Sequence, residues 1–214
     1  MDYGILSGLR PNARPGRDLT PLQGIAEVRA YWEGLRQGGG IPARSSLDPR
    51  GISGALDRVF LAERIGPGLV QIRLAGNSLS EIAGMDPRGL PLSCLFPPEG
   101  RATLARVIER VFEGPVAADL HLQSNREIAR PLLDGRMILL PLLDAAGDCR
   151  LMLGCLALQG ETGRAPRRFD ILNVVEERLR PEPAVVSAPP PPVSSKVHSD
   201  PPGRGHLRLV YSAT

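Results

Sequence analysis

The side chains best suited to nucleophilic chemistry or metal binding in this 214-residue chain are its three cysteines and three histidines. Cys149 and Cys155 are six positions apart in one predicted strand, which would hold them roughly 20 Å apart at ~3.3 Å per residue. A disulfide bond cannot span that distance, and Cys94 also lacks a C-x-x-C partner. An odd number of cysteines without such a framework favours reduced thiols and a cytoplasmic location.

No group of residues in the sequence predicts catalysis or metal binding. A metal site needs several convergent ligands, whereas the histidines are scattered along the chain: His121, His198 and His206. The carboxylates that could serve as acid and base are expected at strand ends or on exposed faces: Asp57, Glu63, Asp119 and Asp144. No G-x-S-x-G, Walker, G-x-G-x-x-G or kinase signature is present. We therefore expect no catalytic residue and no metal ligand.

The composition predicts one core built mainly from aliphatic side chains. Hydrophobic residues make up 42% of the chain and aromatic residues 4%. The formal net charge is +3, but no basic run is interleaved with aromatic residues, so nucleic acid is not an expected partner. No window approaches the ~18 apolar residues of a membrane span, so no membrane association is expected.

A strand that breaks directly into a helix organises the chain. Apolar and polar residues alternate over 70–75, which predicts a half-buried strand with Ile72 and Leu74 in the interior. Ser78 and Glu81 have the spacing of a capping box and predict a short helix just after it. Gly84 supplies the left-handed residue that ends this helix.

The remaining patterns predict an α+β domain. Alternating or continuous apolar runs predict four further strands, at residues 59–65, 116–124, 137–143 and 149–158. Pro98 opens a strongly amphipathic helix, which Gly114-Pro115 ends. Because the strands are joined by short connections, they favour antiparallel pairing. The expected architecture is a five-stranded antiparallel sheet with short helices over one face.

An N-terminal helix is expected beside this domain. Thr20 and Pro21 fit its N-cap and first position, and four apolar residues recur at helical spacing: Ile25, Val28, Trp32 and Leu35. This stripe has two interpretations. It packs on the sheet with Trp32 as its anchor, or it contacts a partner or a second copy of the chain.

Four segments are expected from changes in composition. Residues 1–19 mix Gly, Pro, Arg and Asn and predict a flexible leader, and residues 20–159 form the domain. Residues 160–205 are expected to be a linker, with a short helix at 169–179 and a proline-rich disordered segment. Residues 206–214 are a C-terminal peptide that either pairs with a sheet edge or frays.

The order of strand, strand, three helices and three strands is that of the PAS fold, and short motifs accompany it. They are Tyr31-Trp32, Ile41-Pro42-Ala43-Arg44-Ser45 with Asp48-Pro49, Arg73-Leu74-Ala75-Gly76, and Gly84-Met85-Asp86-Pro87-Arg88-Gly89. In these residues the chain resembles the single-PAS-domain proteins of alphaproteobacteria, a family defined by a domain of unknown function. The resemblance implies sensing through a bound small molecule or protein contact through flanking helices; the fold alone does not decide between them.

The resemblance also implies where a ligand would bind. Flavin photosensors of this fold use a cysteine in an Asn-Cys-Arg context, which Cys94 lacks, and haem-binding members use a histidine on a helix that here has none. The cofactor is therefore unknown, with haem and flavin unsupported. Periodicity suggests a pocket lining, although ordinary core is the favoured interpretation of each residue: Ile72, Leu74, Ile82, Leu95, Leu104, Ile108, Leu120 and Leu122. Arg44 and Asp48 are the polar candidates, either tying the connector to the sheet or reaching a charged group of a ligand.

We therefore expect a non-catalytic PAS-type regulatory module that acts through protein contacts, with gating by a small apolar ligand left open. Its partner would be a separate signalling protein or, through the N-terminal helix, a second copy. The alternative is a small enzyme, isomerase- or hydratase-like, with an ionisable residue buried in an α+β pocket.

Overall fold

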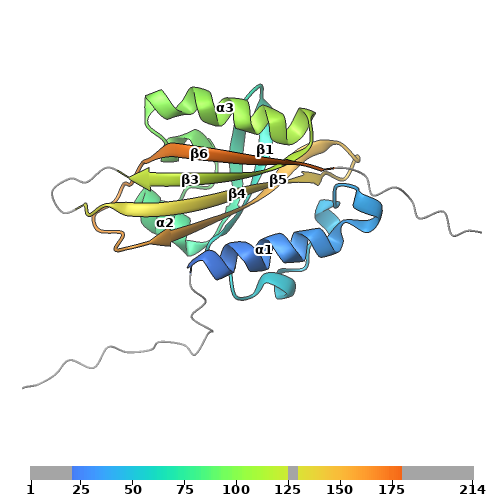
Figure 1. Cartoon of the computed structure of the whole chain (residues 1–214), viewed down its shortest axis with the longest axis horizontal. Coiled ribbons are helices and arrows are strands. Elements are labelled where there is room, and N and C mark those ends of the chain that lie inside the picture. The colour runs from blue at the N-terminus through green and yellow to red at the C-terminus, as the bar shows by residue number, and fades with distance from the viewer. Residues whose placement is uncertain (1–20, 125–129, 180–214) are drawn as a thin grey trace, which may run out of the picture. The chain divides into compact units, whose positions relative to one another are not determined.

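The computed structural model describes residues 21–124 and 130–179, which form one antiparallel sheet with helices on both faces (Figure 1). The strands are β1 (Val59–Gly66), β2 (Leu69–Ala75), β3 (Val116–Ser124), β4 (Leu133–Leu143), β5 (Cys149–Gln159) and β6 (Phe169–Arg178). The helices are α1 (Pro21–Leu35), α2 (Asn77–Ala83) and α3 (Pro98–Glu113). Four 3-10 turns complete the elements: η1 (Gln37–Gly39), η2 (Arg44–Ser46), η3 (Pro49–Ile52) and η4 (Leu92–Leu95).

The predicted α+β architecture is confirmed. The strand order is β2-β1-β5-β4-β3-β6, and every neighbouring pair is antiparallel. All five predicted strands are present, and β6 adds a sixth. The predicted leader at 1–19, the proline-rich segment and the 206–214 peptide lie outside the described residues.

The prediction of a short helix at 169–179 is wrong, because these residues form strand β6 against β3. Leu122 pairs with Ile171 and His121 with Asn173, which leaves Leu172 as an extra, bulged residue. The bulge places two apolar residues side by side and breaks the period of two, so the sequence imitates a helical stripe. The backbone groups of β3 gain partners from this pairing. The domain therefore extends beyond residue 159.

Helix α3 covers one face of the sheet (Figure 1). Pro98 stands at its start, as predicted, where no backbone N–H is needed, and Glu99 lies in its first turn. Its apolar stripe packs with η4, α2 and the inner face of the sheet in one cluster of buried residues, here called the interior cluster. Beyond α3, the backbone amide of Gly114 donates to the carbonyl oxygen of Arg110 and ends the helix.

Helix α1 covers the opposite, outer face (Figure 1). Ile25, Val28 and Trp32 are buried against β4 and β5, and Leu35 is partly buried. The indole N–H of Trp32 donates a 3.0 Å hydrogen bond to the carbonyl oxygen of Pro141 in β4. The packing interpretation of this stripe is therefore confirmed, and a contact role for these side chains stays a prediction. None of the helices in the described ranges is long and apolar enough to cross a membrane.

The predicted interior position of Leu74 is wrong. Leu61 pairs with Leu74, but Ala62 pairs with Ile72, so Arg73 is an extra residue in β2. This bulge reverses the side-chain parity between Ile72, which is buried, and Leu74, which is half exposed on the outer face. The capping box at Ser78 is also not formed. Helix α2 begins at Asn77, and the Ser78 amide donates to the carbonyl oxygen of Asp57 instead.

Candidate functional site

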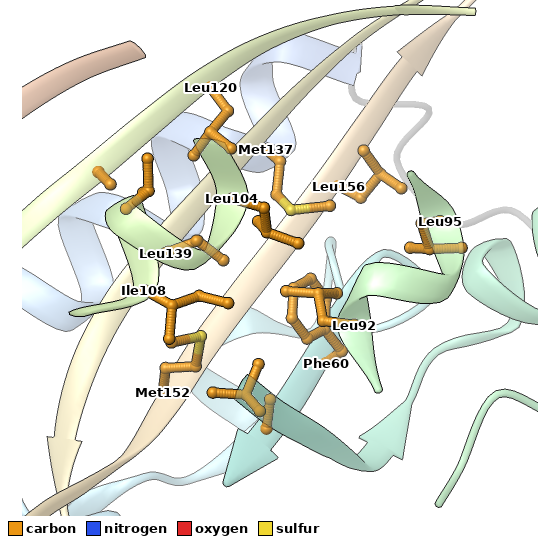
Figure 2. Packing of buried hydrophobic residues seen from close by; sticks show 14 of the residues in the cluster. Phe60, Leu92, Leu95, Leu104, Ile108, Leu120, Met137, Leu139, Met152 and Leu156 are labelled. Atoms are coloured by element: carbon orange, nitrogen blue, oxygen red, sulfur yellow. The ribbon is translucent and has the colours of Figure 1, made fainter. Parts of the chain in front are cut away.

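The interior residues predicted to line a pocket are closely packed core. Seven of the eight are essentially inaccessible and belong to the interior cluster: Ile72, Ile82, Leu95, Leu104, Ile108, Leu120 and Leu122. Figure 2 shows Leu104 and Ile108 of α3 beside Met137 and Met152 of the sheet. Side chains from both layers meet there, so the structure brings these seven residues together as core. Their role in binding a ligand stays a prediction.

The three other candidates meet on the opposite face. Leu74, Arg44 and Asp48 line a cleft of about 530 Å³, here called the outer cleft. It lies between the connector (residues 41–56), the outer face of β1 and β2, and the segment from Gly76 to Arg88. The sequence named these residues but placed Leu74 in the interior, because the bulge that turns Leu74 outward leaves no mark in a period-two pattern.

Three leucines on neighbouring strands form the floor of the outer cleft. Leu61 of β1 pairs with Leu74 of β2 on one side and with Leu153 of β5 on the other. These three residues, here called the leucine row, all line the cleft. Leu153 is buried, whereas Leu74 is 50% exposed and Leu56, in the connector, is 43% exposed. The row therefore leaves apolar surface open at the β2 end.

The connector forms one wall, and α1 holds it in place. The backbone amide of Asp48 donates a 2.6 Å hydrogen bond to the hydroxyl of Tyr31. The backbone amide of Gly54 donates to the Glu27 carboxylate at 3.2 Å. The Asp48 side chain caps η3 by accepting from the Arg50 amide at 2.9 Å, as the Asp48-Pro49 motif predicts. Two residues of α1 thus fix the position of this wall.

The far wall carries an ion pair between Asp86 and Arg88. The Arg88 guanidinium donates to both carboxylate oxygens of Asp86, with the shortest contact at 2.6 Å. These hydrogen bonds lower the pKa of Asp86 from 3.8 to about 2. The positive charge of Arg88 is therefore already matched by a carboxylate of the same wall.

Arg44 is the cation of the outer cleft without a matched acceptor. Its side chain is partly buried beside the apolar floor. Within residues 21–124 and 130–179, its guanidinium makes no hydrogen bond or ion pair. Asp48 lines the same cleft, but its carboxylate serves as the cap of η3. Arg44 thus offers hydrogen-bond donors next to exposed apolar surface.

The thiols are poor candidates for chemistry. All three cysteines are free. Burial raises the pKa of Cys149 to about 11 and that of Cys155 to about 12, and it also raises the pKa of Cys94. The neutral thiol, which is a weak nucleophile, is thus the dominant form. The described residues contain no group of acidic, cysteine and histidine side chains that could hold a metal ion.

Sequence patterns gave no sign of Arg167, which is buried. Its guanidinium donates to the carbonyl oxygens of Thr162 (2.8 Å) and Pro131 (2.5 Å) and to the Ser124 hydroxyl. Together with Arg168 it lines a smaller cleft of about 370 Å³. A buried arginine held by carbonyl groups leaves no periodicity in the sequence, so only the structure reveals it. Its bonds connect the ends of β3, β4 and β6.

Comparisons with known proteins add a family match. A family model described as "PAS domain" matches residues 22–157. The light-state structure of the blue-light photoreceptor Aureochrome1 LOV is 15% identical, with a TM-score of 0.36, over 54% of this chain and 91% of that one. The structure of an RNA-binding Light-Oxygen-Voltage receptor is 18% identical, with a TM-score of 0.37, over 57% of this chain and 36% of that one. Among curated proteins, none matches the chain.

Proposed function

The chain belongs to the PAS domain family, and from this premise we propose that it is a non-catalytic sensory and regulatory module that acts through protein contacts. The family match covers residues 22–157, which is most of the described domain. The closely packed interior cluster supports a scaffold role. The signal would pass to a separate partner protein in the cytoplasm. The narrower kinship with alphaproteobacterial single-PAS-domain proteins is part of the same proposal.

Strand β6 offers the surface that best supports a protein contact. It is the last strand of the sheet, and no other described strand pairs with its outer edge. Leu172 and Val175 on this strand are 61% and 53% exposed. An open sheet edge presents unpaired N–H and C=O groups that pair readily with another chain. Exposed apolar side chains beside such an edge strengthen the case. This surface is the single observation that carries the proposal.

Helix α1 joins this surface to the outer cleft. Arg29 of α1 forms a 2.8 Å ion pair with Glu177 of β6, while Tyr31 of the same helix holds the connector through Asp48. A shift of the connector would therefore reach β6 through α1. We infer that this physical continuity couples the outer cleft to the contact surface on β6.

Photo-crosslinking in the source cells tests the proposed contact. A photo-reactive amino acid replaces Val175 in one variant and Ile65, a comparably exposed residue at 48% on β1, in the control. We expect a discrete cross-linked protein at Val175 and none at Ile65. The same adduct at both positions, or none at Val175, would reject β6 as the contact surface. Sedimentation of the purified chain then separates self-association from binding to a different protein.

A further inference from the structure

We propose that the outer cleft binds a small amphipathic carboxylate, with its apolar body on the leucine row and its carboxylate at Arg44. This proposal deepens the proposed function by naming a ligand class, and it rests on that function for the ligand's regulatory role. The site lies on the face of the sheet opposite the interior cluster and shares only Leu74 with the apolar pocket lining predicted from periodicity.

The floor of the cleft selects an apolar body. The bulge at Arg73 turns Leu74 away from the interior and adds it to the row formed by Leu61 and Leu153. Leu74 remains half exposed there, and Leu56 is nearly as exposed on the connector side. An apolar ligand that covers both side chains removes this surface from water, which favours binding. A volume of about 530 Å³ lies within the range of about 300–1,000 Å³ that is usual for small-molecule pockets.

Arg44 selects a carboxylate at one end of that body. A guanidinium carries five N–H donors in a planar fork, which matches the two oxygens of a carboxylate. Arg44 has no acceptor within the described ranges, and its position beside apolar groups reduces its access to water. The other cation of the cleft, Arg88, already donates to both oxygens of Asp86. The anionic end of a ligand therefore has one available partner.

The charges of the cleft favour a single anionic group. Asp48 caps η3 and Asp86 pairs with Arg88, so each carboxylate of the walls has a role that a ligand does not displace. These two negative charges oppose a ligand with a second anionic group along its body. A monocarboxylate with an aliphatic chain has the apolar body that the floor favours and the single anionic group that the charges favour.

Calorimetric titration of the purified full chain with octanoate and with octan-1-ol tests the proposal. The two probes share their apolar body and differ in charge. We expect Arg44→Gln to weaken octanoate binding at least tenfold and to leave octan-1-ol binding within twofold. Arg50→Gln is the matched control, because Arg50 lies in the same connector, is exposed and does not line the cleft. It should leave the affinity for both probes within twofold of the parent chain.

A second pair of variants tests the location. Leu74→Trp should fill the β2 end of the cleft and abolish binding of both probes, whereas Leu69→Trp, at the start of the same strand and outside the cleft, should preserve it. No octanoate binding in the millimolar range, equal octanoate affinity in Arg44→Gln, or full affinity in Leu74→Trp overturns the proposal. Because only purified protein is used, these outcomes are independent of whether β6 captures a partner.

Discussion

The hydroxyl of Tyr31 accepts a 2.6 Å hydrogen bond from the backbone amide of Asp48 and so ties the first helix to the connector. The ring of Tyr31 also lies against Gly51, so closely that a Cβ there would stand 2.2 Å from the ring. Tyr31 thus contacts the wall of the outer cleft at two points, through its hydroxyl and through its ring.

Removing the Tyr31 hydroxyl should loosen the connector while the domain stays folded. In Tyr31→Phe the Asp48 amide loses its acceptor, whereas the aromatic ring and its packing are kept. Since a net hydrogen bond contributes about 0.5–1.5 kcal/mol, we expect a loss of that size in the free energy of unfolding. Hydrogen exchange at the Asp48 amide should become faster, while exchange in β4 and β5 is unchanged. Unaltered exchange at Asp48 would show that this bond does not hold the connector.

Adding one methyl group at Gly51 should destabilise the domain through the same contact. The Cβ of Gly51→Ala would overlap the Tyr31 ring, and such overpacking typically costs about 1–3 kcal/mol. Gly34→Ala is the matched control. Gly34 lies in α1 with nothing within 4 Å of its added Cβ, so its replacement should stabilise the helix by roughly 0.5–1 kcal/mol. Chemical denaturation of both variants measures their free energies of unfolding. Equal changes in the two variants would show that the Tyr31 ring does not lie against Gly51.

Two positions on β2 should differ greatly in how much they tolerate a charge. Ile72→Asp places a carboxylate in the interior cluster and should abolish cooperative folding. Leu74→Asp, two residues later, meets water and should cost less than about 1 kcal/mol, because substitutions at exposed positions are usually small in effect. Thermal melts followed by circular dichroism provide the test. If Leu74→Asp is unfolded, the result would show that Leu74 lies in the interior and that β2 has no bulge at Arg73.

The contrast between Ile72 and Leu74 shows what the sequence can and cannot predict here. Periodicity located five strands and helix α3, because each buries one regular apolar face. A bulge adds one residue and reverses the faces beyond it, as in β2, or imitates a helical stripe, as in β6. The pairing with the neighbouring strand determines where a bulge occurs, and the sequence of one strand does not show which strand it pairs with or in what register. The same limit applies to the site, since the register between β1 and β2 turns Leu74 to the face where Arg44 lines the outer cleft.

Strand β6 should be required for the stability of the domain. A chain ending at residue 160 leaves β3 without a partner and removes the buried ring of Phe169 from the interior cluster. We expect this chain to lose cooperative thermal unfolding or to aggregate through the exposed edge of β3. A chain ending at residue 183 keeps β6 and should melt like the full chain. Similar melting of the two truncated chains would show that β6 adds nothing to the core.

The buried thiol of Cys155 should make the domain sensitive to alkaline pH. Its pKa rises from 9.0 to about 12 because burial disfavours the thiolate. The folded state therefore holds the proton more tightly than the unfolded state. The stabilisation is fully present below pH 9 and is lost as the pH rises from about 9 to 12. At pH 10 the unfolded chain gains on the order of 1 kcal/mol relative to the folded one from this group.

Replacing Cys155 by alanine removes this dependence and isolates it from other titrating groups. The difference in unfolding free energy between the parent chain and Cys155→Ala should be constant up to pH 8.5. It should then fall by on the order of 1 kcal/mol by pH 10, because only the parent chain has a thiolate to form at this position on unfolding. Cys94→Ala, at a partly exposed thiol, should change the slope less. Urea denaturation at each pH gives the free energies. A difference that stays constant to pH 10 would mean that water reaches Cys155 in the folded state, which contradicts its placement between α1 and the sheet.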